Sequence, residues 1–288
     1  MQYGVTLLNI GVDARLLADL AWDAEEAGWD GVFVWDCIYI ESEGFKGRPV
    51  CDPWIAMTAI AMRTERVRIG PMVTPLTRRR PWKLARETVS LDHLSNGRLI
   101  LPVGLGAIDD GGFSKVGEEI DRKVRAKMLD ESLDILRGLW SAQPFSYSGE
   151  HYHIEEMTFY PPPVQPPGIP IWVVGAWPRK KSMQRVLRCD GVLPSKMNED
   201  GTFAEMTPTD IKEMKAFIDE RRTQTTPFDI VMEGESPGDD HERASAIVQP
   251  LAEAGVTWWL EAVWGTPETQ GGIEGMRTRI RQGPPHVE

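Results

Sequence analysis

Cysteine is scarce in this sequence of 288 residues, and the few that occur follow no binding pattern. The three cysteines are Cys37, Cys51 and Cys189, and no two of them form a Cys-x-x-Cys pair. The spacing therefore argues against a zinc site or a redox dithiol. An odd number of cysteines is more typical of a reducing compartment than of a secreted disulfide scaffold, and we expect a cytoplasmic protein.

Signals for export and membrane insertion are also missing. The first apolar run, residues 3–8, has no basic segment before it and does not have the pattern of a signal peptide. No uninterrupted apolar stretch reaches the roughly 18 residues that a transmembrane helix needs. We therefore expect no membrane span.

Positive charge is in short supply, with 32 Lys and Arg residues against 43 Asp and Glu residues and a net charge of -11. A net-acidic surface repels phosphate backbones and anionic lipids, so we expect neither nucleic acid nor a membrane as a partner. The run Arg78, Arg79 and Arg80 is a local exception. We expect it to lie in a solvated loop or a dimer contact, with ligand binding as the alternative.

Motifs of several large enzyme classes are absent. No Gly-x-Gly-x-x-Gly follows the first apolar run, and no Gly-x-Ser-x-Gly or Walker sequence occurs. This argues against a Rossmann domain, a triad hydrolase and P-loop chemistry. His151 and His153 alternate in a polar segment without a third ligand at a persuasive spacing, so we predict no metal site. His93 belongs to an amphipathic helix, and we expect no catalytic role for it.

What the sequence does contain is a regular alternation of short apolar runs with amphipathic helices. Hydrophobic residues make up 41% and charged residues 26%, as in a soluble globular protein. Apolar runs between helices are typical of parallel strands that are buried on both faces. The eight runs that we expect to be strands are residues 3–8, 31–36, 67–74, 98–104, 171–175, 190–194, 228–232 and 256–263. This α/β pattern predicts a (β/α)₈ TIM barrel that forms a single domain over residues 1–288.

Residues 141–169 interrupt this rhythm. They contain the prolines 161–163 and 166–167, which neither a buried strand nor a helix interior accommodates. We therefore predict an extended insertion between the fourth and fifth βα units.

In such barrels the active site forms at the C-terminal ends of the strands. Asn9 follows the first strand, and Asp36 and Cys37 follow the second. Asp36 is a candidate acid or base, or a group that orients a ligand, with a helix cap or an ion pair as the alternative. Cys37 is a catalytic candidate that is also compatible with a small buried apolar residue. Glu233 and Glu261 lie near the ends of the last two strands, facing either the pocket or solvent.

Two strand ends are rich in small residues. Gly175, Ala176 and Trp177 precede Pro178, and a helix beginning there leaves unpaired backbone N–H groups for a phosphate. The alternative is a plain strand-to-helix turn. Gly104, Leu105 and Gly106 allow a flat ligand to approach the backbone closely, although turn glycines are common.

Several blocks of the sequence are familiar in their order. Five blocks resemble the corresponding blocks of the bacterial-luciferase-like family of flavin- and F420-dependent oxidoreductases: 27–36, 64–70 with 73–75, 91–99 with 103–106, 170–175 and 189–192. The third block is the most specific. The resemblance covers about the first two-thirds of the chain well and the remainder loosely. It implies an enzyme that binds F420 or FMN at the mouth of the barrel, acts on a small-molecule substrate and forms a homodimer.

The resemblance also assigns roles to individual residues. A non-prolyl cis peptide of the family falls, by position, on the bond between Pro71 and Met72. The other implied cofactor contacts are Thr74 at the ring edge, Gly104, Leu105 and Gly106 beside the ring or its side chain, and Gly175, Ala176 and Trp177 at the phosphate.

The sequence departs from the family pattern at three places. Cys37 stands where many relatives carry histidine, and Ala107 stands where deazaflavin-dependent sugar-phosphate dehydrogenases carry glutamate. Both departures argue against that specific activity. Leu105 and Ala107 also occupy the region where luciferase-type members often carry a phosphate-binding arginine.

Several functions consequently stay open. Within the family, hydride transfer and monooxygenation are both compatible with the sequence. The alternatives are a non-catalytic flavin-binding barrel and a TIM-barrel lyase or isomerase that uses Asp36 and Glu261 on a phosphorylated substrate.

Overall fold

The computed structural model describes the chain except residues 41–43, 108–110, 199–201, 263–270, 286 and 288. The chain divides into two compact units. The first unit comprises Met1–Leu7, Leu20–Phe33 and Ile171–Glu288, and the second comprises Leu8–Asp19 and Val34–Pro170. Helix α1 (Ala14–Glu26) and strand β2 (Gly31–Val34) contribute residues to both. The single-domain organisation remains a prediction, and we describe each unit by itself.

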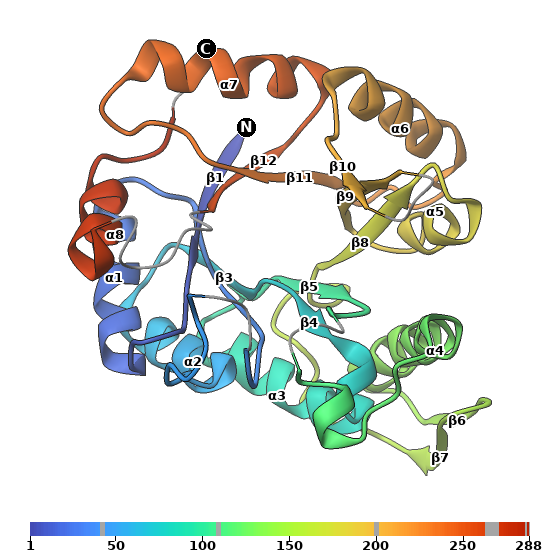
Figure 1. Ribbon diagram of the computed structural model, residues 1–288. Helices are drawn as coiled ribbons and strands as arrows, with labels where there is room; N and C mark the ends of the chain where they lie inside the picture. The colour runs from blue at the N-terminus through green and yellow to red at the C-terminus, as the bar shows by residue number, and fades with distance from the viewer. Residues whose placement is uncertain (41–43, 108–110, 199–201, 263–270, 286, 288) are drawn as a thin grey trace. The chain divides into compact units, whose positions relative to one another are not determined.

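The first unit is built on a parallel sheet. Its strands are β1 (Gln2–Leu7), most of β2, β8 (Ile171–Trp177), β9 (Gly191–Met197), β11 (Asp229–Gly234) and β12 (Trp258–Ala262). They are hydrogen-bonded in the order β2-β1-β12-β11-β9-β8, and the short β10 (Phe203–Ala204) pairs antiparallel with β9. The helices of this unit are α5 (Lys180–Val186), α6 (Pro208–Arg221), α7 (His241–Ala254) and α8 (Gly272–Arg281), and α6 packs beside α7 (Figure 1).

The strand register sorts the side chains of this sheet onto two faces. Paired residues of parallel strands share a face, and successive residues alternate. We call the face that carries the mutually packed rings of Phe33, Trp172 and Trp258 the inner face, and the opposite one the outer face. The other inner-face residues are Gln2, Gly4, Thr6, Val174, Ala176, Gly191, Leu193, Ser195, Asp229, Val231, Glu233, Leu260 and Ala262.

Local sequence signals explain where two helices of the first unit begin and end. Thr207 and Asp210 form a reciprocal capping box around the start of α6, with Pro208 in the first turn. Helix α7 begins after the N-cap Asp240 and ends at Gly255, whose φ of 109° lies in the left-handed region that favours glycine.

The second unit contains β3 (Arg68–Pro71), β4 (Thr74–Pro75) and β5 (Leu101–Gly104) with α2 (Pro53–Arg63), α3 (Pro81–Leu94) and α4 (Arg122–Trp140). Two 3₁₀ turns, Leu76–Arg78 and Ser114–Val116, complete it. Strand β4 pairs parallel with β5. Asp52 caps α2, and Asn96 and Gly97 follow α3 with φ angles of 55° and 79°.

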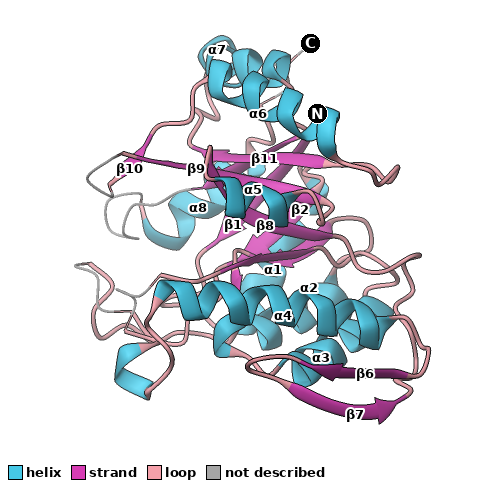
Figure 2. Ribbon diagram, turned by 90° about the vertical axis from the view of Figure 1, so that its right-hand side faces the viewer, coloured by secondary structure: helices cyan, strands magenta, loops and turns pink. Residues whose placement is uncertain are grey.

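The segment 141–169 contains a β-hairpin, which the sequence did not predict. Strands β6 (Phe145–Ser148) and β7 (His153–Met157) run antiparallel and side by side (Figure 2). The hairpin is fastened to α4, because the Glu131 carboxylate accepts hydrogen bonds from the backbone N–H groups of residues 150–152 and pairs with His151 Nδ1 at 2.8 Å. His151 is thus a structural residue.

The predicted strands 67–74 and 256–263 need correction. The first is split into β3 and β4, and the cis peptide lies between Met72 and Val73, one bond later than expected. The Met72 N–H donates to Val34 O at 2.7 Å, so the Pro71–Met72 peptide still belongs to the strand ladder. In the second, β12 ends at Ala262, and Val263 lies outside the described residues.

Among the described helices, none combines the length and the apolar character that a membrane crossing requires.

Candidate active site

Asp36 is the centre of a buried polar cluster in the second unit. Its side chain is 0% exposed and accepts hydrogen bonds from the Thr74 hydroxyl at 2.8 Å and from Arg79 Nη2 at 2.8 and 2.9 Å. Arg78 Nη2 lies 3.7 Å from the same carboxylate and donates to the Asp36 carbonyl at 3.1 Å. Protein partners therefore occupy both carboxylate oxygens, which favours the ion-pair alternative. The catalytic role of Asp36 remains a prediction.

The arginine run corrects the sequence interpretation. Arg78 and Arg79 do not lie in a solvated loop, because their side chains are only 5% and 18% exposed and face Asp36. Arg79 also stacks on the Trp54 ring, with 5.4 Å between the guanidinium carbon and the ring centroid. Arg80 alone is exposed, immediately before α3. Compensation of a buried carboxylate explains the burial of two adjacent arginines.

Two buried donors beside this cluster have no hydrogen-bond partner among the described residues. They are the Trp54 indole Nε1 and the Arg79 Nε. A buried donor without an acceptor costs about 1–3 kcal/mol, so such groups are expected to meet an acceptor in the working protein.

The loop after β5 is held by an arginine that sequence reasoning missed. Arg125 is 3% exposed, and its Nη1 donates to the carbonyls of Leu105 and Gly106 at 3.0 and 3.2 Å. A Cβ on Gly106 would approach Phe113 and Pro75 to 2.7 Å, and its φ is +84°. Packing and backbone conformation both require glycine there, independently of any ligand.

Thr74 and Met72 are buried in the second unit, as is Gly104. The Thr74 hydroxyl donates its hydrogen bond to Asp36, so it can act only as an acceptor toward a ligand. Leu105 and Gly106 are partly exposed. The cofactor contacts assigned to Pro71, Met72, Thr74, Gly104, Leu105 and Gly106 remain predictions.

The helix that follows Gly175, Ala176 and Trp177 begins slightly later than the phosphate prediction assumed. Helix α5 begins at Lys180 instead of Pro178, and the Trp177–Pro178 peptide is cis. The Ala176 N–H already donates to Ser182 Oγ at 2.9 Å. A Cβ on Gly175 would meet Val192 at 2.6 Å, so close packing on the outer face explains this glycine. The predicted binding role itself is untested.

The two glutamates that the sequence left open face opposite sides of the sheet in the first unit. Glu261 lies on the outer face and is 1% exposed, bound by the Ser236 hydroxyl at 2.6 Å and paired with Arg279 at 3.1 Å. Glu233 lies on the inner face, and from the described residues its carboxyl group receives one long hydrogen bond, donated by the Thr6 hydroxyl at 3.4 Å. Burial raises the pKa of Glu233 to about 7, and the Thr6 hydrogen bond only partly opposes this.

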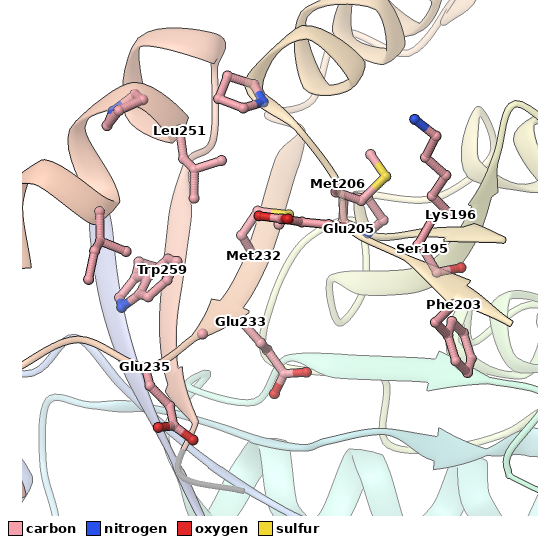
Figure 3. Close-up of a pocket in the computed structure, with 16 residues that line it drawn as sticks. Ser195, Lys196, Phe203, Glu205, Met206, Met232, Glu233, Glu235, Leu251 and Trp259 are labelled. Atoms are coloured by element: carbon pink, nitrogen blue, oxygen red, sulfur yellow. The ribbon is translucent and has the colours of Figure 1, made fainter. Parts of the chain in front are cut away.

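A cavity of about 600 Å³ lies beside the same strands, and Glu233 is one of the residues that line it. Its lining residues include Lys196, Met232 and Trp259 on the outer face and Leu251 from α7. Pro208 at the start of α6 lines it too, and Figure 3 draws Met232 and Glu233 of β11 together among the lining residues. The cavity is therefore a space between the sheet and the helices of the first unit.

Cys37 is buried, with its Sγ 3.8 Å from Asn9 Oδ1. Asn9 in turn donates to the Cys51 carbonyl at 2.6 Å. The catalytic role of Cys37 stays a prediction. No disulfide joins the three cysteines, and no group of three potential metal ligands occurs among the described residues. His93 is exposed and contacts the Pro162 carbonyl.

The sequence as a whole matches the profile of the luciferase-like monooxygenases over residues 2–269. The chain belongs to this family. The membership confirms the resemblance that the ordered sequence blocks indicated.

A similar curated protein is the F420-dependent glucose-6-phosphate dehydrogenase of Gordonia bronchialis, which is 34% identical over 168 residues. The match covers 58% of this chain and 48% of that protein, so the chain spans about half the length of the curated relatives it matches.

Two solved structures share the fold. An F420-dependent secondary alcohol dehydrogenase, solved with an F420–acetone adduct, superimposes with a TM-score of 0.76 at 18% identity and covers 98% of both chains. The coenzyme F420-dependent tetrahydromethanopterin reductase of Methanopyrus kandleri gives a TM-score of 0.71 at 14% identity, over 100% of this chain and 99% of that one. This likeness confirms the predicted barrel fold class and says nothing more specific.

Proposed function

We propose that this protein is an F420-dependent oxidoreductase that transfers a hydride between the deazaflavin and a small organic alcohol or carbonyl compound. The observation that carries the proposal is the 34% identity to an F420-dependent dehydrogenase, within a family profile that spans residues 2–269. The predicted oxidoreductase class agrees with the names of these relatives.

The second unit offers groups that suit such a cofactor. A deazaflavin presents several carbonyl acceptors, and the Trp54 and Arg79 N–H groups are buried donors that meet no acceptor within the described part of the chain. The Thr74 oxygen and the partly exposed backbone of Leu105 and Gly106 supply further polar contacts. We propose that these residues hold the ring. The other contacts that the resemblance implies are part of the same proposal: Pro71, Met72 and Gly104 near the ring, and Gly175, Ala176 and Trp177 at the phosphate.

The protein's own task in this chemistry is orientation, electrostatics and exclusion of water, because the bound deazaflavin supplies the hydride chemistry itself. Asp36 holds the Arg79 guanidinium and the Thr74 hydroxyl in fixed positions. Arg125 holds the carbonyls of Leu105 and Gly106 in place through two hydrogen bonds. Because these hydrogen bonds already hold the side chains and the loop in place, ligand binding requires little conformational change at the site.

The substrate class is defined partly by what the chain lacks. Ala107 and Cys37 stand at the positions where the resemblance leads us to expect glutamate and histidine. We therefore do not extend the proposal to glucose 6-phosphate, and propose an uncharged alcohol or carbonyl compound instead.

Titration of the purified protein with F420 and, separately, with FMN tests the proposal, with cofactor fluorescence as the readout. We expect saturable binding of F420 and weaker binding of FMN. Arg125→Met should weaken F420 binding, because the loop after β5 loses its brace, whereas the exposed Arg80→Met should not. Binding of FMN alone would support the monooxygenase alternative, and binding of neither would contradict a cofactor role. Light scattering tests the proposed homodimer.

A further inference from the structure

We propose that the cavity beside β9 and β11 is a binding site for an uncharged aromatic molecule. All of its lining residues belong to the first unit, and none of them is among the cofactor contacts proposed above. The inference therefore goes beyond the proposed function and does not depend on it.

The cavity exists because two neighbouring strands separate. Strand β9 pairs with β11 through two residues, Gly191 and Val192, and the pairing goes no further along these two strands, which are described over their whole length. The edge of β9 that faces β11 is next occupied by β10, because Ala204 pairs with Lys196 while β8 holds the other edge of β9 at the same residue. Strands that separate in this way present backbone N–H and C=O groups toward the gap. The separation also explains why residues from both faces of the sheet line one cavity.

The walls of the cavity are largely apolar. Met206 follows β10, Leu251 comes from α7, and Met232 and Trp259 come from β11 and β12 (Figure 3). Methionine side chains adapt to irregular shapes and make favourable sulfur contacts with aromatic rings. The volume of about 600 Å³ is in the range of small-molecule sites, which is about 300–1,000 Å³. These walls favour a flat aromatic ligand.

The charges around the cavity disfavour anions. Its described lining contains three glutamates, Glu205, Glu233 and Glu235, and a single cation, Lys196. The Lys196 ammonium donates to both oxygens of the Asp210 carboxylate, at 2.7 and 2.9 Å. An anionic ligand would therefore meet carboxylates and no uncommitted cation among these residues. Because any charged ligand would also lose its hydration against the apolar walls, the lining favours an uncharged one.

Two exposed apolar side chains line the cavity as well. Phe203 of β10 is 79% exposed, and Ile247 of α7 is 38% exposed. Apolar side chains that are exposed beside a hollow are typical of ligand-binding grooves. A bound aromatic ring would remove part of their surface from water, which favours binding.

Fluorescence titration with a matched pair of probes tests the site. N-Phenyl-1-naphthylamine is uncharged, whereas 1-anilinonaphthalene-8-sulfonate carries the same rings and a negative charge, and both emit more strongly in apolar surroundings. We expect saturable binding of the uncharged probe at one molecule per chain, and binding of the sulfonate that is weaker by about 10-fold or more. Absence of saturable binding of the uncharged probe, or tighter binding of the sulfonate, would overturn the inference.

Filling the cavity should remove the binding. Leu251→Trp should weaken binding of the uncharged probe about 10-fold or more, whereas Glu253→Trp, at an exposed position of the same helix, should not change it. Thermal unfolding establishes that both variants are folded. Equal effects of the two tryptophans would place the probe elsewhere and refute the site.

Charge reversal tests the same site without disturbing its packing. Glu205 is exposed, so Glu205→Lys should fold like the wild type. It should strengthen binding of the sulfonate about 10-fold and leave the uncharged probe nearly unaffected, whereas Glu253→Lys should do neither. If both lysine variants bind the sulfonate alike, the charge argument is wrong.

Methyl NMR locates the probe directly. In protein labelled with carbon-13 at the methionine methyl groups, the uncharged probe should shift the resonances of Met206 and Met232, which are assigned from Met206→Leu and Met232→Leu. The resonance of Met62 on α2, which is 76% exposed, should not move. Absence of shifts at Met206 and Met232 would overturn the inference. No cofactor is added, so the result is independent of F420 binding.

Discussion

Replacement of Glu233 by glutamine should change the pH dependence of folding stability, whatever the substrate. Burial raises the pKa of this carboxyl group from 4.5 to about 7 in the folded protein. The folded state therefore holds the proton more tightly than the unfolded chain does. Stability from this source is fully present below about pH 4.5 and is lost as the pH rises through about 7.

The size of the effect follows from the two pKa values. The difference between 4.5 and about 7 is about 2.5, which corresponds to about 3 kcal/mol when one pKa unit is worth about 1.4 kcal/mol. Between about pH 5 and about pH 8 the wild type should lose roughly 2–3 kcal/mol from this group alone. The amide of Glu233→Gln does not titrate, so the stability of the variant relative to the wild type should rise over that range.

Urea unfolding at the two pH values measures this difference, with substitution of the exposed Glu205, Glu205→Gln, as the control. The difference in the free energy of unfolding between Glu233→Gln and the wild type should grow with pH, and that of Glu205→Gln should not. A difference for Glu233→Gln that is independent of pH would refute the placement of Glu233 in an apolar environment.

Two further variants probe the packing of the candidate site. Arg79→Met should destabilise the protein by about 3 kcal/mol in thermal or urea unfolding, because Asp36 keeps its burial and loses its shortest ion pair, whereas the exposed Arg80→Met should change stability by less than about 0.5 kcal/mol. Equal effects of both would contradict the buried cluster. Gly175→Ala should cost about 1–3 kcal/mol through overpacking against Val192, and Gly168→Ala, whose Cβ meets only an ordinary contact, should cost little. Equal costs of the two glycine substitutions would contradict the close packing at Gly175.

Much of the fold was accessible from the sequence, because caps and apolar runs act locally. Asp52 and Thr207 cap helices that begin directly after them, and the left-handed pair Asn96 and Gly97 ends α3. The alternation of apolar runs and helices predicted the barrel class that the structural comparisons confirm. The hairpin in residues 141–169 was missed, since its strands are short and flanked by prolines.

The site was less accessible, because its contacts join residues that are distant in sequence. A run of three arginines gives no sign that Arg79 will meet a carboxylate 43 positions away. The sequence also could not predict which face of the sheet Glu233 and Glu261 lie on. Strands of a barrel are apolar on both faces, so the alternation of their residues does not distinguish the inner face from the outer one. Only the strand register assigned Glu233 to the inner face and Glu261 to the outer one.

The most direct measurement follows the transferred hydrogen. Secondary alcohols carrying deuterium on the carbinol carbon are incubated with the protein and oxidised F420, and the reduced cofactor is analysed by mass spectrometry. The account predicts that the deuterium appears on F420 with loss of an equal amount of alcohol, and that no oxygen is consumed. Reduced F420 without deuterium, or oxygen consumption that requires FMN in place of F420, would contradict it.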